Sequence, residues 1–306
     1  MHEKEPDLRV SLAGILLKNP ITTASGTFSA KESGKFYDLN ALGAIITKGV
    51  SSEAWAGNQT PRIAETYGGM LNAIGLQNPG IDDFLAHELP ALSALDTRII
   101  VNVAGRTLDE YCSVVEKLQD DRVDLLEINI SCPNIKAGGI GFGTSPKLAA
   151  ELTREVRKIA RQPIIIKLTP NVTDITEIAR AVEAEGADAL SLINTLLAMK
   201  IDVHTGRPDL CNRTGGLSGP AIKPVAVRMV YQVRRAVAIP IMGVGGIMTG
   251  EDAAEFIMAG ADAISVGTAA LLDPCAPLRI RDELIAFMKS HHYKSIKEIQ
   301  NGFIDC

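Results

Sequence analysis

Short apolar runs alternate with longer segments of helical periodicity along most of the chain. Eight runs are rich in Ile, Val and Leu, a composition typical of parallel strands that are buried on both faces. These predicted strands cover residues 20–23, 44–50, 98–103, 124–130, 163–168, 189–193, 240–244 and 263–266. The predicted helices, in which apolar residues recur every three or four positions, cover residues 107–119, 145–161, 174–186, 221–237, 250–260 and 277–290.

The regular alternation of strands and helices predicts an α/β fold with a parallel sheet. Eight units in 306 residues leave about 38 residues for each, and eight such units close naturally into a (β/α)8, or TIM, barrel. A doubly wound open sheet is the alternative, but no early strand is followed by the G-x-G-x-x-G fingerprint of that fold. Residues 8–17 predict an N-terminal β-hairpin that turns at Ala13 and Gly14. We find no flexible linker and expect one domain over residues 1–306.

Charge and composition exclude several function classes. The net charge is −5, aromatic residues make up 4% and no basic run occurs, so we expect neither a nucleic-acid nor an acidic-membrane partner. We also expect no signal peptide and no membrane span, because no apolar segment is long enough. The five cysteines are scattered without a C-x-x-C pair, which argues against a disulfide framework and an iron–sulfur site in this chain. Free thiols indicate a reducing, cytoplasmic compartment.

Polar residues gather at the carboxyl ends of the predicted strands, where TIM barrels carry their active sites. Buried Lys and Asn side chains are costly without a partner, so their recurrence on six strands favours a binding site over core hydrogen bonding. No histidine falls at such an end, so we expect no metal site. The strand ends carry Ser25, Lys48, Asn102, Asn129, Lys167, Asn194, Thr195 and Thr268.

Glycines follow the last two predicted strands, at Gly245, Gly246 and Gly267. Loops at these places in a TIM barrel commonly bind phosphate through backbone N–H groups. Glycine also simply permits tight turns. Its presence in both expected loops favours a phosphorylated cofactor or substrate.

Lys48 and Lys167 leave several chemical roles open. A lysine beneath a bound ring stabilises negative charge that develops during a reaction. A structural ion pair is an equally good explanation, and so is a Schiff-base lysine of the kind that barrel aldolases use.

Cys132 follows the fourth predicted strand and opens a glycine-rich loop. Most single cysteines are inert and buried, but a thiol at the rim of a site acts as a base or nucleophile when its pKa is lowered. A second long segment, residues 196–218, shows no clear periodicity. Such a segment is either a functional lid or a surface insertion.

Several motifs together resemble those of dihydroorotate dehydrogenases, in order and over essentially the whole chain. The longest are Asn129-Ile-Ser-Cys-Pro-Asn134, Asn72-Ala-Ile-Gly-Leu-Gln-Asn78 and Gly215-Gly-Leu-Ser-Gly-Pro-Ala-Ile-Lys223. Shorter ones are Thr47-Lys48-Gly49, Ile166-Lys167-Leu168, Ile193-Asn194-Thr195, Gly243-Val-Gly-Gly246 and Val266-Gly-Thr268. The resemblance implies an FMN-binding barrel that oxidises (S)-dihydroorotate to orotate in de novo pyrimidine (UMP) biosynthesis.

The resemblance also indicates a class within the family. Cysteine at position 132 is similar to class 1, because class 2 enzymes use serine there and add a membrane segment. The segments around Asn72 and Gly215 look like the NAD-linked class 1B catalytic subunit. This implies a partner subunit that carries FAD and a [2Fe–2S] cluster, passes electrons to NAD+, and forms a heterotetramer of two catalytic and two electron-transfer chains. The alternatives are fumarate-linked class 1A and a dihydropyrimidine dehydrogenase-like FMN barrel.

The resemblance assigns roles residue by residue. Cys132 is implied as the base that removes the C5 proton of dihydroorotate. The implied FMN contacts are Ser25, Lys48, Gly49, Asn102, Asn129, Lys167, Ile193, Gly219, Gly245, Gly246, Gly267 and Thr268. The implied substrate contacts are Lys48, Asn72, Ala73, Ile74, Gly75, Leu76, Asn129, Asn134, Asn194 and Thr195.

Overall fold

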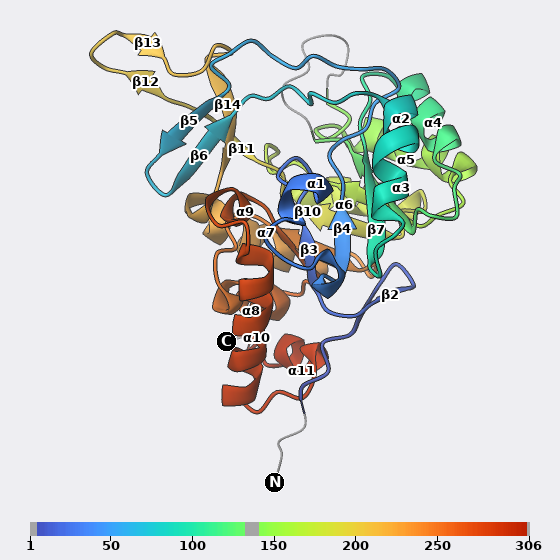
Figure 1. The fold of residues 1–306 in the computed structure, drawn as a ribbon, viewed down its shortest axis with the longest axis vertical. Coiled ribbons are helices and arrows are strands. Elements are labelled where there is room, and N and C mark those ends of the chain that lie inside the picture. The colour runs from blue at the N-terminus through green and yellow to red at the C-terminus, as the bar shows by residue number, and fades with distance from the viewer. Residues whose placement is uncertain (1–4, 132–140, 305–306) are drawn as a thin grey trace.

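Eight parallel strands close into a barrel in the computed structural model of this chain, which describes residues 5–131 and 141–304 (Figure 1). The predicted (β/α)8 fold is therefore confirmed. Neighbouring strands follow one another in chain order, and the last strand closes on the first through the pair Ile264 and Ile21. The barrel strands are β3 (Ile21–Thr23), β4 (Ala44–Ile46), β7 (Arg98–Val103), β8 (Leu125–Asn129), β9 (Ile164–Lys167), β10 (Ala189–Leu192), β15 (Ile241–Val244) and β16 (Ala263–Val266).

Successive side chains of each barrel strand point alternately outward, toward the covering helices, and inward, into the barrel. On β8, Leu126 and Ile128 belong to the large core between the strands and the outer helices. Leu125 points into the barrel and packs in a separate apolar cluster at its lower end. By the same alternation Glu127 and Asn129 also point into the barrel, at successively higher levels.

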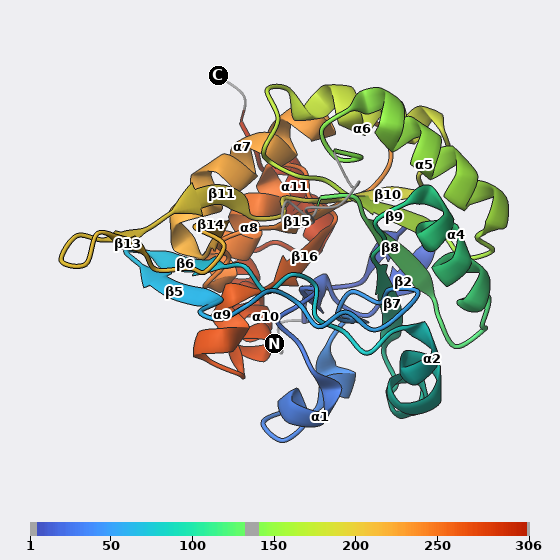
Figure 2. The same cartoon turned by 90° about the horizontal axis from the view of Figure 1, so that it is seen from above.

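The outer helices surround the barrel, as the view from above shows (Figure 2). On α5, Ser145 caps the first turn by accepting a hydrogen bond from the Leu148 amide, and Pro146 occupies the first helical position. Its buried Ala149, Leu152 and Val156 share one face at helical spacing. The helices that cover the barrel are α4 (Leu108–Lys117), α5 (Pro146–Ile159), α6 (Ile175–Ala184), α7 (Lys223–Arg234), α8 (Gly250–Met258) and α10 (Ala276–Ser290). They match the six predicted helices within three residues at each end.

The N-terminal hairpin closes the lower end of the barrel. Strands β1 (Val10–Leu12) and β2 (Ile15–Leu17) pair around a turn with positive φ at Ala13 and Gly14, as predicted. Leu12 and Leu17 are fully buried against inward-facing residues of the barrel strands. Burial of this kind contributes roughly 1.5–3 kcal/mol for each leucine.

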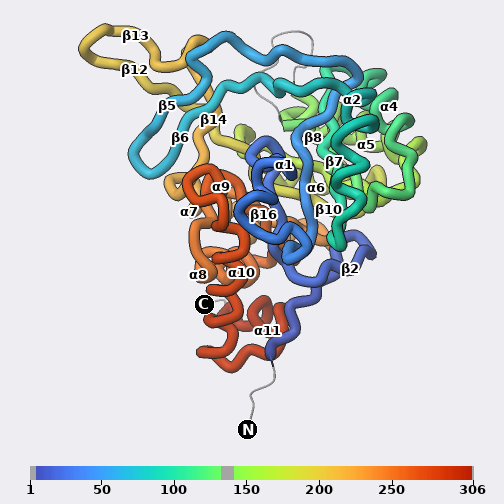
Figure 3. Tube along the Cα trace, viewed as in Figure 1, coloured from blue at the N-terminus to red at the C-terminus, as the bar shows by residue number. Residues whose placement is uncertain are grey.

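A small antiparallel sheet lies over the opposite end, and the sequence pattern did not predict it (Figure 3). It joins β5 (Ile63–Thr66) and β6 (Gly69–Asn72) to β11 (Leu196–Met199) and β14 (Thr214–Ser218). Residues 196–218, which showed no periodicity, therefore contain two of its strands, and the hairpin of β12 (Ile201–Asp202) and β13 (Arg207–Pro208) extends from it.

Short helical segments complete the described chain. None of the helices in the described ranges combines the length and the apolar character that crossing a bilayer requires. The short segments are α1 (Ala30–Ser33), η1 (Leu39–Ala41), α2 (Ile81–Asp83), η2 (Phe84–Glu88), α3 (Leu89–Leu92), η3 (Pro220–Ile222), α9 (Thr268–Leu272) and α11 (Ile296–Asn301).

Candidate active site

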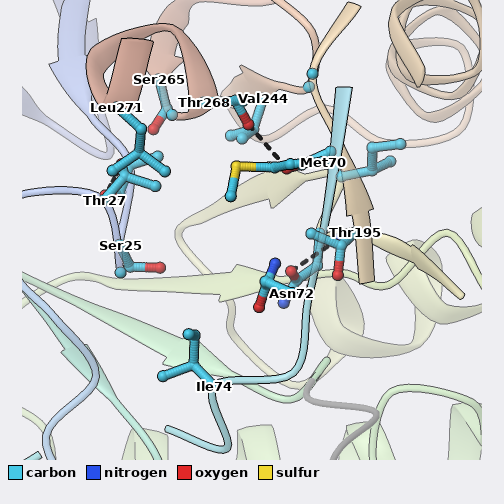
Figure 4. Close-up of a pocket in the computed structure, with 18 of the residues that line it drawn as sticks. Ser25, Thr27, Met70, Asn72, Ile74, Thr195, Val244, Ser265, Thr268 and Leu271 are labelled. Carbon is cyan, nitrogen blue, oxygen red and sulfur yellow. Dashed lines mark hydrogen bonds between the residues drawn. The ribbon is translucent and has the colours of Figure 1, made fainter. Parts of the chain in front are cut away.

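A cavity of about 270 Å³ opens at the carboxyl ends of the barrel strands, beneath the small antiparallel sheet. All eight barrel strands, or the residues directly after them, contribute to its lining. Figure 4 shows Ser25 and Asn72 approaching this space from opposite sides, with Thr268 at a third side. The sequence pattern predicted this location from the polar residues at the strand ends.

Every residue that the resemblance assigned to cofactor contact lies on this one cavity. These residues come from segments as distant in the sequence as Ser25 and Thr268. The cavity is lined by Ser25, Lys48, Gly49, Asn102, Asn129, Lys167, Ile193, Gly219, Gly245, Gly246, Gly267 and Thr268.

Most of the residues assigned to substrate contact share the cavity as well, namely Lys48, Asn72, Ile74, Gly75, Leu76, Asn129, Asn194 and Thr195. Ala73 does not line it. Its side chain is 1% exposed and packs on the other side of the sheet with Leu71 and Leu210, because successive residues of an extended chain face opposite ways. Cys132 and Asn134 lie outside the described residues.

Hydrogen bonds connect the asparagines to the last described residue before Cys132. Ser131 is buried, and its hydroxyl donates to Asn129 Oδ1 at 2.8 Å. Asn194 Nδ2 donates to the same hydroxyl at 2.5 Å. The start of the loop that carries Cys132 is therefore anchored directly beside two residues of the cavity.

A buried ion pair lies at the floor of the cavity, where Lys167 belongs to the lining and Glu127 lies behind it. Glu127 is 0% exposed and Lys167 is 4% exposed, and they are the only charged side chains buried in the described part of the chain. Lys167 Nζ lies 3.5 Å from Glu127 Oε2 and donates to Ser25 Oγ at 2.8 Å. Lys167 therefore forms the ion pair that was one of its possible roles. It also belongs to the lining of the cavity, so a role toward a bound molecule is compatible with the ion pair.

The pattern of polar strand ends did not predict Glu127, because this residue lies two positions before the end of β8. Its signal was an acidic residue within an apolar strand, two positions before Asn129 and hence on the same inward face. The carboxylate accepts hydrogen bonds from Asn102 Nδ2 at 2.5 Å and from Ser191 Oγ at 2.7 Å.

Lys48 stands at the side of the cavity in a different electrostatic setting. Burial and the nearby positive charge of Arg62 lower the pKa of the Lys48 amine, and Glu88 partly opposes this effect. Burial and the charge of Asp83 raise the pKa of Glu88 in turn, against the influence of Lys48. An anion bound beside Lys48 would restore its preference for the charged form.

Gly245 and Gly246 form a tight turn after β15, with φ angles of 130° and 77°. A Cβ atom at Gly246 would lie 2.8 Å from the carbonyl oxygen of Gly219, and one at Gly245 would lie 2.9 Å from the Cβ of Ala226. Only glycine allows both this backbone conformation and this close approach. The turn is thus shaped to present backbone rather than side chains to the cavity.

Lys223 packs against this turn and is hydrogen-bonded to the first part of helix α8. The Asp252 carboxylate accepts from the amides of Met248 and Thr249 and completes a capping box at the start of α8. Lys223 Nζ donates to Asp252 at 2.6 Å and to Glu255 at 2.7 Å. Burial lowers the pKa of Lys223, but its hydrogen bonds to these two carboxylates and their negative charge raise the pKa overall.

Comparison with known proteins identifies the family of the chain. A family model described as dihydroorotate dehydrogenase matches residues 7–288. The chain is 58% identical to the protein of Alkaliphilus metalliredigens named dihydroorotate dehydrogenase B (NAD(+)), catalytic subunit, over 97% of this chain and 98% of that one. Proteins of the same name from Geobacter sulfurreducens and Geotalea uraniireducens are 55% and 54% identical, over 97% and 98% of this chain and 98% and 99% of theirs.

A solved structure shares the fold. The crystal structure of a dihydroorotate dehydrogenase from Eimeria tenella in complex with ferulenol superposes with a TM-score of 0.81 at 22% identity. The match covers 98% of this chain and 89% of that one. At this identity the likeness concerns the fold alone.

Proposed function

Since this chain belongs to the dihydroorotate dehydrogenase family, we propose that it is the catalytic subunit of an NAD-linked enzyme that oxidises (S)-dihydroorotate to orotate in pyrimidine biosynthesis. The observation that carries the proposal is one cavity that gathers Lys48, Lys167 and three asparagines, Asn72, Asn129 and Asn194. Lysine binds a carboxylate, and the paired donor and acceptor atoms of asparagine suit a cyclic ureide, whose edge alternates N–H and C=O.

The cavity also fits FMN. The Asn102 Oδ1 atom is buried and has no hydrogen-bond partner among the described residues, whereas its Nδ2 is used by Glu127. An unpaired acceptor on Asn102 and a donor on Lys167, both in the lining of this cavity, suit the pyrimidine edge of a flavin, which offers N–H and C=O groups side by side. The turn at Gly245 and Gly246 offers backbone amides to a phosphate. FMN, when bound, supplies an acceptor for the hydride that leaves C6 of dihydroorotate.

The residues of the chain would bind and position the reactants. Lys48 pairs with the substrate carboxylate, and Asn72, Asn129 and Asn194 orient the ring. Ser25, Lys167 and Asn102 hold the flavin ring, and Gly219, Gly245, Gly246, Gly267 and Thr268 surround its phosphate. Lys167 places positive charge where negative charge develops.

We assign the proton at C5 of dihydroorotate to the thiolate of Cys132. Support comes from its attachment to Ser131, which bonds to Asn129 and Asn194 of the cavity. Carrying away one proton and one hydride completes the oxidation of the C5–C6 bond. A free thiol has a pKa of about 8.5, so a base that works at neutral pH requires a lowered pKa.

A second subunit completes the proposed enzyme. The relatives are named catalytic subunits of an NAD-linked enzyme, and the name itself implies a further chain. We propose that this partner carries FAD and a [2Fe–2S] cluster and that two copies of each chain form a heterotetramer. The free thiols of Cys112, Cys211 and Cys275 support a cytoplasmic location.

Anaerobic reduction of the purified, FMN-loaded chain tests the proposal. We expect dihydroorotate to bleach the flavin and dihydrouracil to leave it oxidised. Bleaching by dihydrouracil alone would instead indicate a dihydropyrimidine dehydrogenase-like activity, and a chain that takes up no FMN would refute the proposal.

The variant Cys132→Ala tests the assignment of the base. It should retain FMN and orotate but reduce the flavin at least ~100-fold more slowly, the lower end of what a general base contributes. The matched control is Cys211→Ala, since Cys211 is exposed and does not line the cavity. Unchanged flavin reduction in Cys132→Ala would contradict the assignment.

A further inference from the structure

Glu127 has no assigned role, although it is the only fully buried carboxylate in the described part of the chain. It does not line the cavity but lies directly behind residues that do. Its two oxygens have separate partners, Ser191 for Oε1 and both Asn102 and Lys167 for Oε2. Two of these three partners, Asn102 and Lys167, face the cavity.

The position of Glu127 follows from the barrel itself. The register pairs Asn102 with Glu127 between β7 and β8, and pairs Ser191 with Lys167 between β9 and β10. Between β8 and β9 the register pairs Glu127 with Ile165 and Asn129 with Lys167, so Lys167 stands one inward-facing position above Glu127. The side chains of Asn102, Lys167 and Ser191 reach Glu127 from three other strands at the level just below the cavity. The apolar cluster of Leu125, Ile165 and Ala189 fills the interior beneath its carboxylate. A charge at this level acts upward on the cavity with little screening, because water is excluded from below.

The pair sums to zero charge beneath the cavity. Lys167 alone would leave an uncompensated cation in contact with whatever occupies the site, and would strongly favour any anion formed there. Glu127, at 3.5 Å, cancels much of that field while holding the ammonium in place. A flavin that takes up a hydride gains one negative charge, so its reduction responds to the net charge below it.

We propose that Glu127 is a positioning residue that lowers the reduction potential of the flavin by offsetting the charge of Lys167. The inference rests on the proposed function, because it needs FMN in this cavity. A lower potential suits an enzyme whose electrons continue to NAD+, since it keeps the reduced flavin a sufficiently strong donor. A purely structural role for Glu127 would require only its hydrogen bonds, not its charge.

The variant Glu127→Gln separates these roles, because the amide has nearly the same shape and still bonds to Asn102 and Ser191 while the charge is lost. Spectroscopic redox titration of the FMN-loaded protein should give a higher midpoint potential than the wild type. We expect at least a tenfold rise in the reduced-to-oxidised ratio at a fixed ambient potential, which is about 30 mV for a two-electron couple. Glu127→Asp should restore most of the wild-type value, and Ser191→Ala, which keeps the charge, should change the potential much less.

An unchanged potential in Glu127→Gln, with or without a lower melting temperature, would overturn the inference and leave the proposed function intact. A wild-type chain that takes up no FMN would overturn both. If Glu127→Gln does not fold, the comparison moves to Lys167→Met and the double variant Glu127→Gln/Lys167→Met, which has no buried charged side chain within residues 5–131 and 141–304. The double variant should have a higher potential than Lys167→Met, and equal potentials would refute the role of Glu127.

Discussion

Gly246→Ala should damage both stability and cofactor retention, by an amount that the structure allows us to work out. Gly246 has a φ of 77°, a conformation that costs an L-residue roughly 1–2 kcal/mol. The added Cβ would lie 2.8 Å from the Gly219 carbonyl oxygen and 2.9 Å from the Lys223 amide nitrogen, both of them backbone atoms. Relieving such overpacking costs a further ~1–3 kcal/mol. We expect a total loss of ~2–5 kcal/mol.

The control is Gly206→Ala, which has the same kind of backbone without the crowding. Gly206 has a φ of 68°, and nothing lies within 4 Å of the position of its Cβ. The variant Gly206→Ala should therefore lose only the ~1–2 kcal/mol of unfolding free energy that the positive φ costs, and it should retain FMN. Urea unfolding of the apoprotein measures the stabilities, and gel filtration of the loaded protein measures the FMN retained. Equal stability and equal retention in the two variants would refute the argument that the turn needs glycine for close packing.

Two further predictions concern the charged residues around the cavity. Because the pKa of Lys48 is lowered, the affinity for orotate should fall at alkaline pH, as the Lys48 ammonium loses its proton. Lys48→Ala should bind orotate ~10–100-fold more weakly at neutral pH and should not show this alkaline limb, the fall in affinity at high pH. Calorimetric titration across pH measures it, and an alkaline limb that persists in the variant would exclude Lys48 as its source. Lys223→Met should lose ~1–2 kcal/mol of stability in urea unfolding at pH 7, since the half-buried ion pair with Asp252 is broken. The pKa of Asp252 is lowered in the folded protein, so the stability that this carboxylate contributes is present above its unfolded pKa of about 3.9 and is lost as the pH falls through its folded pKa. A stability difference between wild type and Lys223→Met that stays constant below pH ~4 would contradict the pairing.

The barrel was predictable because its signal is local. Each strand is a short run buried on both faces, such as Ile164–Lys167, and six of the eight precede one of the helices that cover the barrel. The small antiparallel sheet over the cavity was not predicted. Its strands β5 and β6 form a local hairpin, but β6 pairs with β14 across a long stretch of sequence, as Asn72 does with Gly216, and no local pattern indicates such a partner.

The site shows the same division. Strand ends located the cavity, since the topology of a TIM barrel brings all of them to one face. The sequence pattern did not predict Glu127, because its partners Asn102, Lys167 and Ser191 lie on three other strands and only the folded barrel brings them together. Ala73 was assigned to substrate contact with its neighbours in the motif, although the alternation of an extended chain turns its side chain away from the cavity.

The closure of β3 on β16 also constrains the order of events during synthesis. Thr23 and Ser265 lie side by side in the finished barrel, but 242 positions separate them in the chain. At ~5–20 residues per second, the ribosome needs roughly 10–50 s to supply the strand that β3 awaits. Throughout that interval one edge of β3 lacks its ladder partner, and such edges invite pairing with other chains. Gly267 and Thr268 emerge only with that last strand, so the complete cavity forms after nearly the whole chain has been translated.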